Sequence, residues 1–99
     1  MRLNSETRQA LVRTVRSMAP EAKTIRLFGS RLDDHARGGD VDLMVEFDQA
    51  IERPALLAAR IAVQASRALA GRNVDIVLKA PNLRETGIHR VAMATGIEL

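Results

Sequence analysis

The chain contains no cysteine, tryptophan or tyrosine, and its only aromatic residues are Phe28 and Phe47. The lack of cysteine excludes disulfides, thiolate nucleophiles and sulfur-ligated zinc. Two phenylalanines supply little surface on which the bases of single-stranded nucleic acid can stack, so direct nucleic-acid binding is not expected. No apolar run is long enough to span a membrane, and charged residues interrupt the N-terminal segment where a signal peptide needs its apolar core. We therefore expect a cytoplasmic protein without a membrane anchor.

The composition is that of a small globular protein with unevenly distributed charge. Ninety-nine residues, 46% of them hydrophobic and 27% charged, predict a single domain over residues 1–99. The net charge is +3, carried by thirteen arginines and two lysines. Half of the acidic residues nevertheless fall in one short stretch, namely Asp33, Asp34, Asp40, Asp42, Glu46 and Asp48. An acidic region on a basic chain suits a metal ion that binds a polyphosphate.

Hydrophobic periodicity predicts three helices and three strands. In chain order they are a helix capped by Asn4 or Ser5 and stopped by Pro20, strands over 24–28 and 40–47, a helix over 54–70 with Gly71 as its C-terminal cap, a strand over 73–79, and a helix over 82–94. This order predicts an α/β (α+β) fold in which helices cover a small mixed three-stranded sheet.

The helix predicted over 54–70 is apolar on two flanks. One flank holds Leu57, Ile61, Ala65, Ala68 and Leu69, the other holds Leu56, Ala59 and Val63, and arginines recur every seven residues at 53, 60 and 67. Two apolar flanks usually mean two packing partners. The sheet is one of them, and the second is either another helix of this chain or a second protein.

Two aspartates on one predicted strand are the strongest sign of chemistry. Because successive side chains of a strand point to opposite faces, Asp40 and Asp42 project in the same direction, with Cα atoms roughly 6–7 Å apart. Asp75 lies on the outward face of the next predicted strand. If the two strands are neighbours with these faces aligned, the three carboxylates converge, and their repulsion is relieved by Mg²⁺ ions in a two-metal phosphoryl-transfer site.

A glycine and a serine at the end of the first predicted strand complement the acids. Gly29 lets backbone N–H groups approach a phosphate closely, and Ser30 adds a hydroxyl donor. Arg31 follows and can neutralise phosphate charge. A strand, this Gly-Ser pair, a nine-residue spacer over 31–39, the two aspartates and one further strand aspartate together predict a nucleotide site.

The segments F-G-S-R, G-G-D-V-D-L-M-V and N-V-D-I-V-L resemble those of the DNA polymerase β-like nucleotidyltransferase superfamily, in particular its minimal nucleotidyltransferase (MNT) domains. The resemblance covers almost the whole chain and implies a polymerase β palm-like fold. It implies nucleotide binding by Gly29 and Ser30, and more loosely by Arg31, and metal binding and catalysis by Asp40, Asp42 and Asp75. The spacer is slightly shorter than is usual in the family.

The resemblance further implies the reaction and the partner. A member of this superfamily uses two Mg²⁺ ions to move a nucleoside monophosphate, such as AMP from ATP, to an acceptor hydroxyl. Minimal members are often antitoxins that adenylylate a HEPN-type toxin encoded nearby, within a hetero-oligomer. Two alternatives stay open, a non-catalytic antitoxin or binding module that acts by occlusion, and a small-molecule nucleotidyltransferase of the antibiotic-modifying type.

Overall fold

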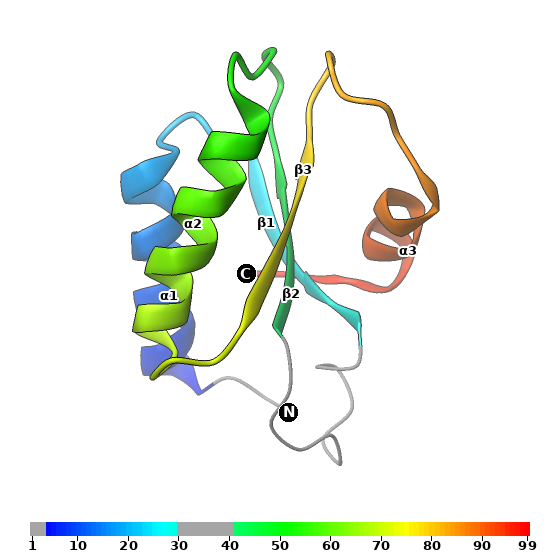
Figure 1. Cartoon of the computed structure of the whole chain (residues 1–99). Coiled ribbons are helices and arrows are strands. Elements are labelled where there is room, and N and C mark those ends of the chain that lie inside the picture. Colours follow the sequence, from blue (N-terminus) through cyan, green and yellow to red (C-terminus); the bar gives the residue numbers. More distant parts are fainter. Residues whose placement is uncertain (1–3, 30–40) are drawn as a thin grey trace.

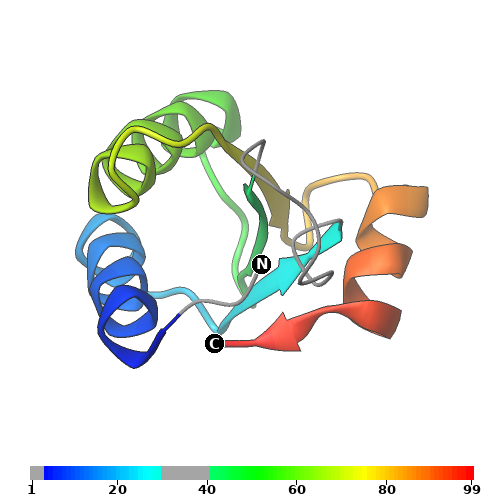
Figure 2. The ribbon, with the colours of Figure 1, turned by 90° about the horizontal axis from the view of Figure 1, so that it is seen from below.

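The computed structural model describes residues 4–29 and 41–99, which form three helices and four strands. The helices are α1 (Ser5–Met18), α2 (Pro54–Ala68) and α3 (Gly87–Thr95), and the strands are β1 (Thr24–Phe28), β2 (Val41–Glu46), β3 (Val74–Lys79) and β4 (Ile97–Glu98). They build one mixed sheet in the order β3-β2-β1-β4. Helices α1 and α2 cover one face of the sheet and α3 covers the other (Figures 1 and 2).

The main core lies between the sheet and the α1–α2 layer. Strict alternation in β2 turns Val41, Leu43 and Val45 toward the helices, where all three are fully buried. Leu11 and Val15 of α1 and Ile61 and Ala65 of α2 close this core from the helical side. Since β2 and β3 are parallel, they need a crossover connection, and α2 is that crossover.

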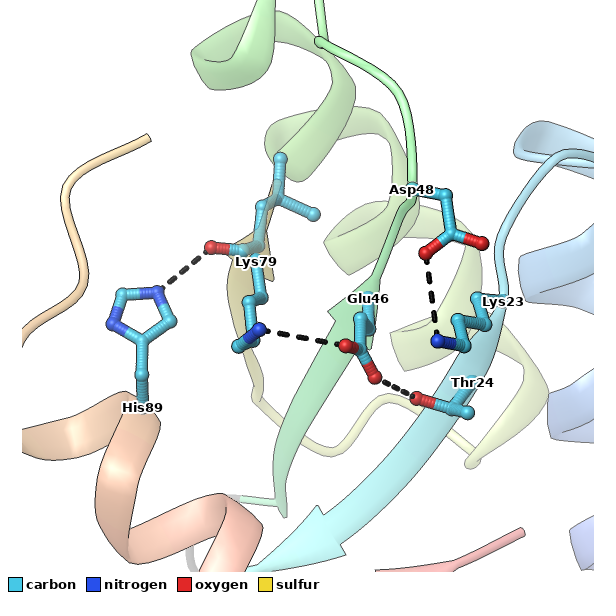
Figure 3. Close-up of polar contacts among 7 residues, drawn as sticks. Lys23, Thr24, Glu46, Asp48, Lys79 and His89 are labelled. Atoms are coloured by element: carbon cyan, nitrogen blue, oxygen red, sulfur yellow. Dashed lines mark hydrogen bonds and ion pairs between the residues drawn. The ribbon is translucent and has the colours of Figure 1, made fainter. Parts of the chain in front are cut away.

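A smaller core on the opposite face holds α3 against the sheet. Phe28, Met44 and Ala92 are buried there, with Val77 packed beside them. His89 adds a polar tie, because its Nε2 lies 2.8 Å from the carbonyl oxygen of Leu78 (Figure 3). Its Nδ1 accepts the backbone N–H of Thr86 at 3.0 Å. The second bond leaves the ring proton on Nε2, so that atom donates to β3. Met44 is therefore core, and His89 fastens α3 to the sheet.

The predicted elements and the fold class are confirmed, but the strand count is wrong. The sheet has four strands, since β4 pairs antiparallel with β1 through Ile97 and Glu98. The last helix starts at Gly87 and not near residue 82, because the Asn82 side chain bonds both backbone groups of Ile51, at 3.0 and 2.8 Å. That pair of bonds makes Asn82 part of a loop.

The end of α2 also differs from the prediction. The helix stops at Ala68, and the N–H groups of Gly71 and Ala70 donate to the carbonyl oxygens of Ser66 and Arg67, at 2.8 and 3.3 Å. This is a Schellman arrangement, in which the residue after the C-cap adopts a left-handed conformation. Here that residue is Ala70, with φ of 58°, and Gly71 follows with φ of 86°. Gly71 thus takes part in the cap, as predicted. The residue directly after the C-cap, where glycine is usual, is however Ala70.

None of the helices in residues 4–29 and 41–99 has the length and apolar character needed to cross a bilayer.

Candidate active site

The two acids that the sequence places on different strands lie side by side. β2 and β3 pair in parallel with Asp42 opposite Asp75, one step into each strand. Both point to the face opposite the main core, with Cα atoms roughly 4.8 Å apart, the usual spacing of neighbouring strands. The predicted alignment of the two acid faces is therefore present. Like charges directly opposite each other destabilise a sheet, and a bound cation would reverse that cost.

The end of β1 completes a row with these two acids. Phe28 is the register partner of Asp42, and Gly29 follows it with φ of 80°, a conformation that favours glycine. A Cβ atom built on Gly29 would collide with Oδ2 of Asp42 and lie 3.2 Å from its Cγ. The backbone at Gly29 thus lies directly against the Asp42 carboxylate, where a side chain would not fit.

Three of the predicted site residues, Ser30, Arg31 and Asp40, lie outside the described residues. Their roles stay predictions. Within residues 4–29 and 41–99, no group of three or more histidine, aspartate or glutamate side chains could hold a metal ion. Asp42 and Asp75 alone are two, so the predicted set of three needs Asp40, the residue just before β2.

Asp75 is accessible from the outer edge of the sheet. Asp42 is half-buried, whereas Asp75 is exposed on the edge strand β3. A shallow groove of about 460 Å³ runs from Asp75 and Asn73 to Ser66 and Arg67 at the end of α2. A ligand that contacts Asp75 can therefore reach it through this groove without displacing core residues.

The donor set suits Mg²⁺ and a polyphosphate. Carboxylate oxygens are the ligands that Mg²⁺ prefers, and Mg²⁺ keeps several phosphate or water oxygens in its octahedral shell. Asp42 and Asp75 supply such oxygens from rigid strands, and Gly29 lets the backbone at the end of β1 lie directly against the Asp42 carboxylate. The described part of the site fits the group that the sequence predicts.

A second polar cluster lies at the far end of the same two strands and was not predicted from the sequence. Glu46 is opposite Lys79, with Oε2 to Nζ at 3.4 Å, and its Oε1 accepts the Thr24 hydroxyl at 2.9 Å (Figure 3). Lys23 and Asp48 form another pair at 3.5 Å. Glu46 was counted in the acidic stretch, but its charge is balanced locally. Glu46 and Lys79 are neighbours because of the register in which β2 pairs with β3, and this register could not be predicted from the sequence.

Comparison with solved structures places the fold among toxin–antitoxin complexes. The chain is similar to a mutant MntA–HpeT toxin–antitoxin complex (21% identity, TM-score 0.68, covering 97% of this chain and 71% of the other). It is also similar to a toxin–antitoxin complex with AMP-PNP (21% identity, TM-score 0.67, covering 91% and 69%). A third similar structure is the tri-AMPylated Shewanella oneidensis HEPN toxin in complex with MNT antitoxin (18% identity, TM-score 0.66, covering 97% and 71%). At these identities the likeness establishes the fold.

No curated protein matches the chain. A sequence profile of the nucleotidyltransferase domain, in contrast, matches residues 8–96, from the first helix to the residue before β4. The matched segment contains every predicted site residue, the paired aspartates of β2 and β3 included. The chain therefore belongs to the nucleotidyltransferase domain family.

Proposed function

We propose that this nucleotidyltransferase domain uses Mg²⁺ to move AMP from ATP to an acceptor hydroxyl, with pyrophosphate as the leaving group. The observation that carries the proposal is the cross-strand register of Asp42 with Asp75. Beside them lies Gly29, at a position where any side chain would collide with Asp42. Two carboxylates in direct register supply the oxygen ligands that a catalytic Mg²⁺ site needs.

In this proposal Asp40, Asp42 and Asp75 hold two Mg²⁺ ions between them, and Gly29, Ser30 and Arg31 hold the phosphates of ATP. The ions supply charge stabilisation and activation of the acceptor oxygen when bound. The protein's own task is positioning. The strands fix Asp42 and Asp75 relative to each other, and Gly29 with the residues that follow it in the sequence would position the phosphates relative to the acids.

We propose further that the acceptor is a HEPN-type toxin and that the domain acts as its antitoxin, within a hetero-oligomer. Two observations support this choice. The similar folds come from toxin–antitoxin complexes, one with AMP-PNP and one with an AMPylated HEPN toxin. In addition, the second apolar flank of α2 stays uncovered in the described structure, where Leu56 is 42% and Val63 is 51% exposed.

The direct test is transfer of label from α-labelled ATP. The purified chain is incubated with Mg²⁺, labelled ATP and a HEPN-type protein encoded beside its gene. Labelled partner protein is expected with the wild type and with Glu46→Gln, which changes an acid outside the site. Asp42→Asn should remove the label. Absence of label with the wild type would contradict the proposal.

The same experiment separates the alternatives. If the double variant Asp40→Asn/Asp42→Asn still neutralises the toxin fully in cells, neutralisation works by occlusion and not by transfer. If the toxin stays unlabelled while a small hydroxyl compound is labelled in an acceptor screen, the domain is a small-molecule nucleotidyltransferase. Either result replaces the acceptor named here.

A further inference from the structure

The solvent face of α2 carries a regular stripe of basic and apolar side chains. Its members are spaced alternately three and four residues apart, and we call them the α2 stripe: Arg53, Leu56, Arg60, Val63 and Arg67. All five are exposed, and no acidic residue lies between the first and the last. This spacing keeps side chains on one line along a helix, as in the seam of a coiled coil.

Shallow grooves flank the stripe along its length. One, of about 280 Å³, borders Leu56 with Ile51 and Leu57, and a second, of about 500 Å³, borders Val63 with Met18 and Ala59. The third is the groove of about 460 Å³ that runs past Arg67 to Asp75. The C-terminal end of the stripe therefore shares a groove with Asp75, one residue of the candidate active site.

We propose that the α2 stripe docks an acidic amphipathic helix of the acceptor protein. This rests on the proposed function, since it takes the acceptor to be a protein. The apolar side chains of such a helix fill the spaces beside Leu56 and Val63, and its carboxylates pair with Arg53, Arg60 and Arg67. Arginine suits these pairs because its planar guanidinium binds a carboxylate through two parallel hydrogen bonds. Docking on this line delivers the acceptor beside Asp75.

Two other occupants fit the stripe less well. A second copy of the chain would bring its own arginines against these three, so like charges would face each other across the interface. Nucleic acid would satisfy the arginines but leave the intervening Leu56 and Val63 against a polar backbone, and no aromatic side chain lies on the stripe for base stacking. An acidic helix satisfies both the charged and the apolar positions.

The layer on the other side of the sheet offers matched controls. Val91 on α3 is 50% exposed, against 51% for Val63, and Arg90 on α3 is exposed as Arg60 is. Substitutions at these pairs remove equal apolar surface or reverse equal charge. The two members of each pair lie on different layers of the molecule, α2 and α3.

The test measures binding of the HEPN-type acceptor to the full chain by calorimetry. Val63→Asp and Arg60→Glu should each weaken the Kd at least about tenfold, the loss expected for central interface residues. Val91→Asp and Arg90→Glu should change it less than about twofold. Circular dichroism of each variant checks folding, and Leu56→Ser replaces any variant that fails. Unchanged binding by the stripe variants, or weakening by the α3 variants instead, would overturn the proposal.

A probe independent of the acceptor uses two synthetic peptides of about three heptads with identical apolar positions. The first peptide has glutamate, and the second has lysine, at the positions that would face the three arginines of the α2 stripe. The acidic peptide should bind at least about tenfold more tightly by fluorescence anisotropy, and Arg60→Glu should abolish the preference. No binding of the acidic peptide would count against docking. If the wild type self-associates in sedimentation and Val63→Asp does not, the stripe binds a second copy of the chain. If the wild type binds RNA and Arg60→Glu does not, the stripe binds nucleic acid.

These outcomes also separate docking from catalysis. Asp42→Asn should abolish AMP transfer and leave the Kd for the acceptor unchanged. If the acceptor binds through the stripe but is never labelled, the proposed function fails and docking stands. If the acceptor is labelled with equal KM by the wild type and Val63→Asp, transfer stands and docking fails.

Discussion

The two ends of the β2–β3 pair treat charge in opposite ways. At one end Asp42 faces Asp75, and at the other Glu46 faces Lys79, in the same register and on the same face of the sheet. The second pair satisfies its charges within the protein, with Nζ to Oε2 at 3.4 Å and a further bond from Thr24. The first pair places like charges together. The two ends therefore differ in the sign of the cross-strand neighbour, and two carboxylates in register are an arrangement in which a cation can be held.

Removing the acids should give the largest effect. Asp42→Asn and Asp75→Asn are each expected to lower AMP transfer about 10³-fold, the scale of losing one essential electrostatic group in an active site. Glu46→Gln, at the other end of the strands, should leave the rate within about twofold. Initial rates of label transfer from ATP measure this. An equal loss of transfer rate in Glu46→Gln and in the aspartate variants would mean that all these substitutions act through folding and not through the site.

Gly29 should be the next most sensitive position. Gly29→Ala adds a methyl group that collides with Asp42 in a left-handed backbone, so we expect loss of most activity and a destabilisation of about 2–3 kcal/mol. Gly71→Ala is the control, because its φ is 86° but no atom lies within 4 Å of the added Cβ. It should cost only about 1 kcal/mol and leave activity intact. Urea unfolding measures both, and equal costs would show that the collision is relieved elsewhere.

Magnesium should reverse the order of stability of the wild type and Asp75→Asn. Without metal, Asp75→Asn should be up to about 1 kcal/mol more stable than the wild type, because the repulsion in the register pair is gone. A wild-type site holding Mg²⁺ at about 100 times its Kd gains about 2.7 kcal/mol. The wild type should then melt above the variant. Thermal unfolding with EDTA and with MgCl₂ shows whether the curves cross, and parallel shifts would contradict metal binding by this pair.

The opposite-charge end should respond least. Lys79→Met is expected to lower the free energy of unfolding by about 1 kcal/mol, since the side chains of Lys79 and Glu46 are only 30% and 14% exposed. Lys23→Met breaks a pair whose side chains are 54% and 73% exposed, so it should change stability by less than about 0.3 kcal/mol. Urea titrations of the two variants test the difference. A larger cost at Lys23 would contradict the role of burial.

Much of this architecture could be predicted from the sequence because its strands alternate cleanly. The period-2 pattern placed Asp42 and Asp75 each on the side of its strand opposite the buried residues, and the observed pairing of β2 with β3 then puts them on one face. Pro20 and Pro54 correctly marked the end of α1 and the start of α2. The fourth strand could not be predicted, because two residues are too short to show alternation. Ser30, Arg31 and Asp40 remain predictions from the pattern of the chain alone.

Other features depend on contacts between distant residues. The hydrogen bonds from His89 to Leu78 and from Asn82 to Ile51 join segments that are separated in the sequence. No local sequence pattern predicts that these segments are in contact. The pair of Glu46 and Lys79 needs the register of the parallel β2–β3 ladder, which the alternation within each strand does not specify. Ala70 in a left-handed conformation breaks the usual preference for glycine and was accordingly missed.

The parallel pairing of β2 and β3 has a consequence for how activity reports on the native state. Residues 47–73, which include α2, separate the two strands in the chain, so the acid pair exists only after a long-range closure. β3 is also a border strand with a single hydrogen-bonded neighbour. Local detachment of that strand would erase catalysis while the β1–β2 hairpin and α1 persist. On warming, enzymatic turnover should therefore disappear before helical ellipticity does, which makes turnover the more sensitive gauge of an intact molecule.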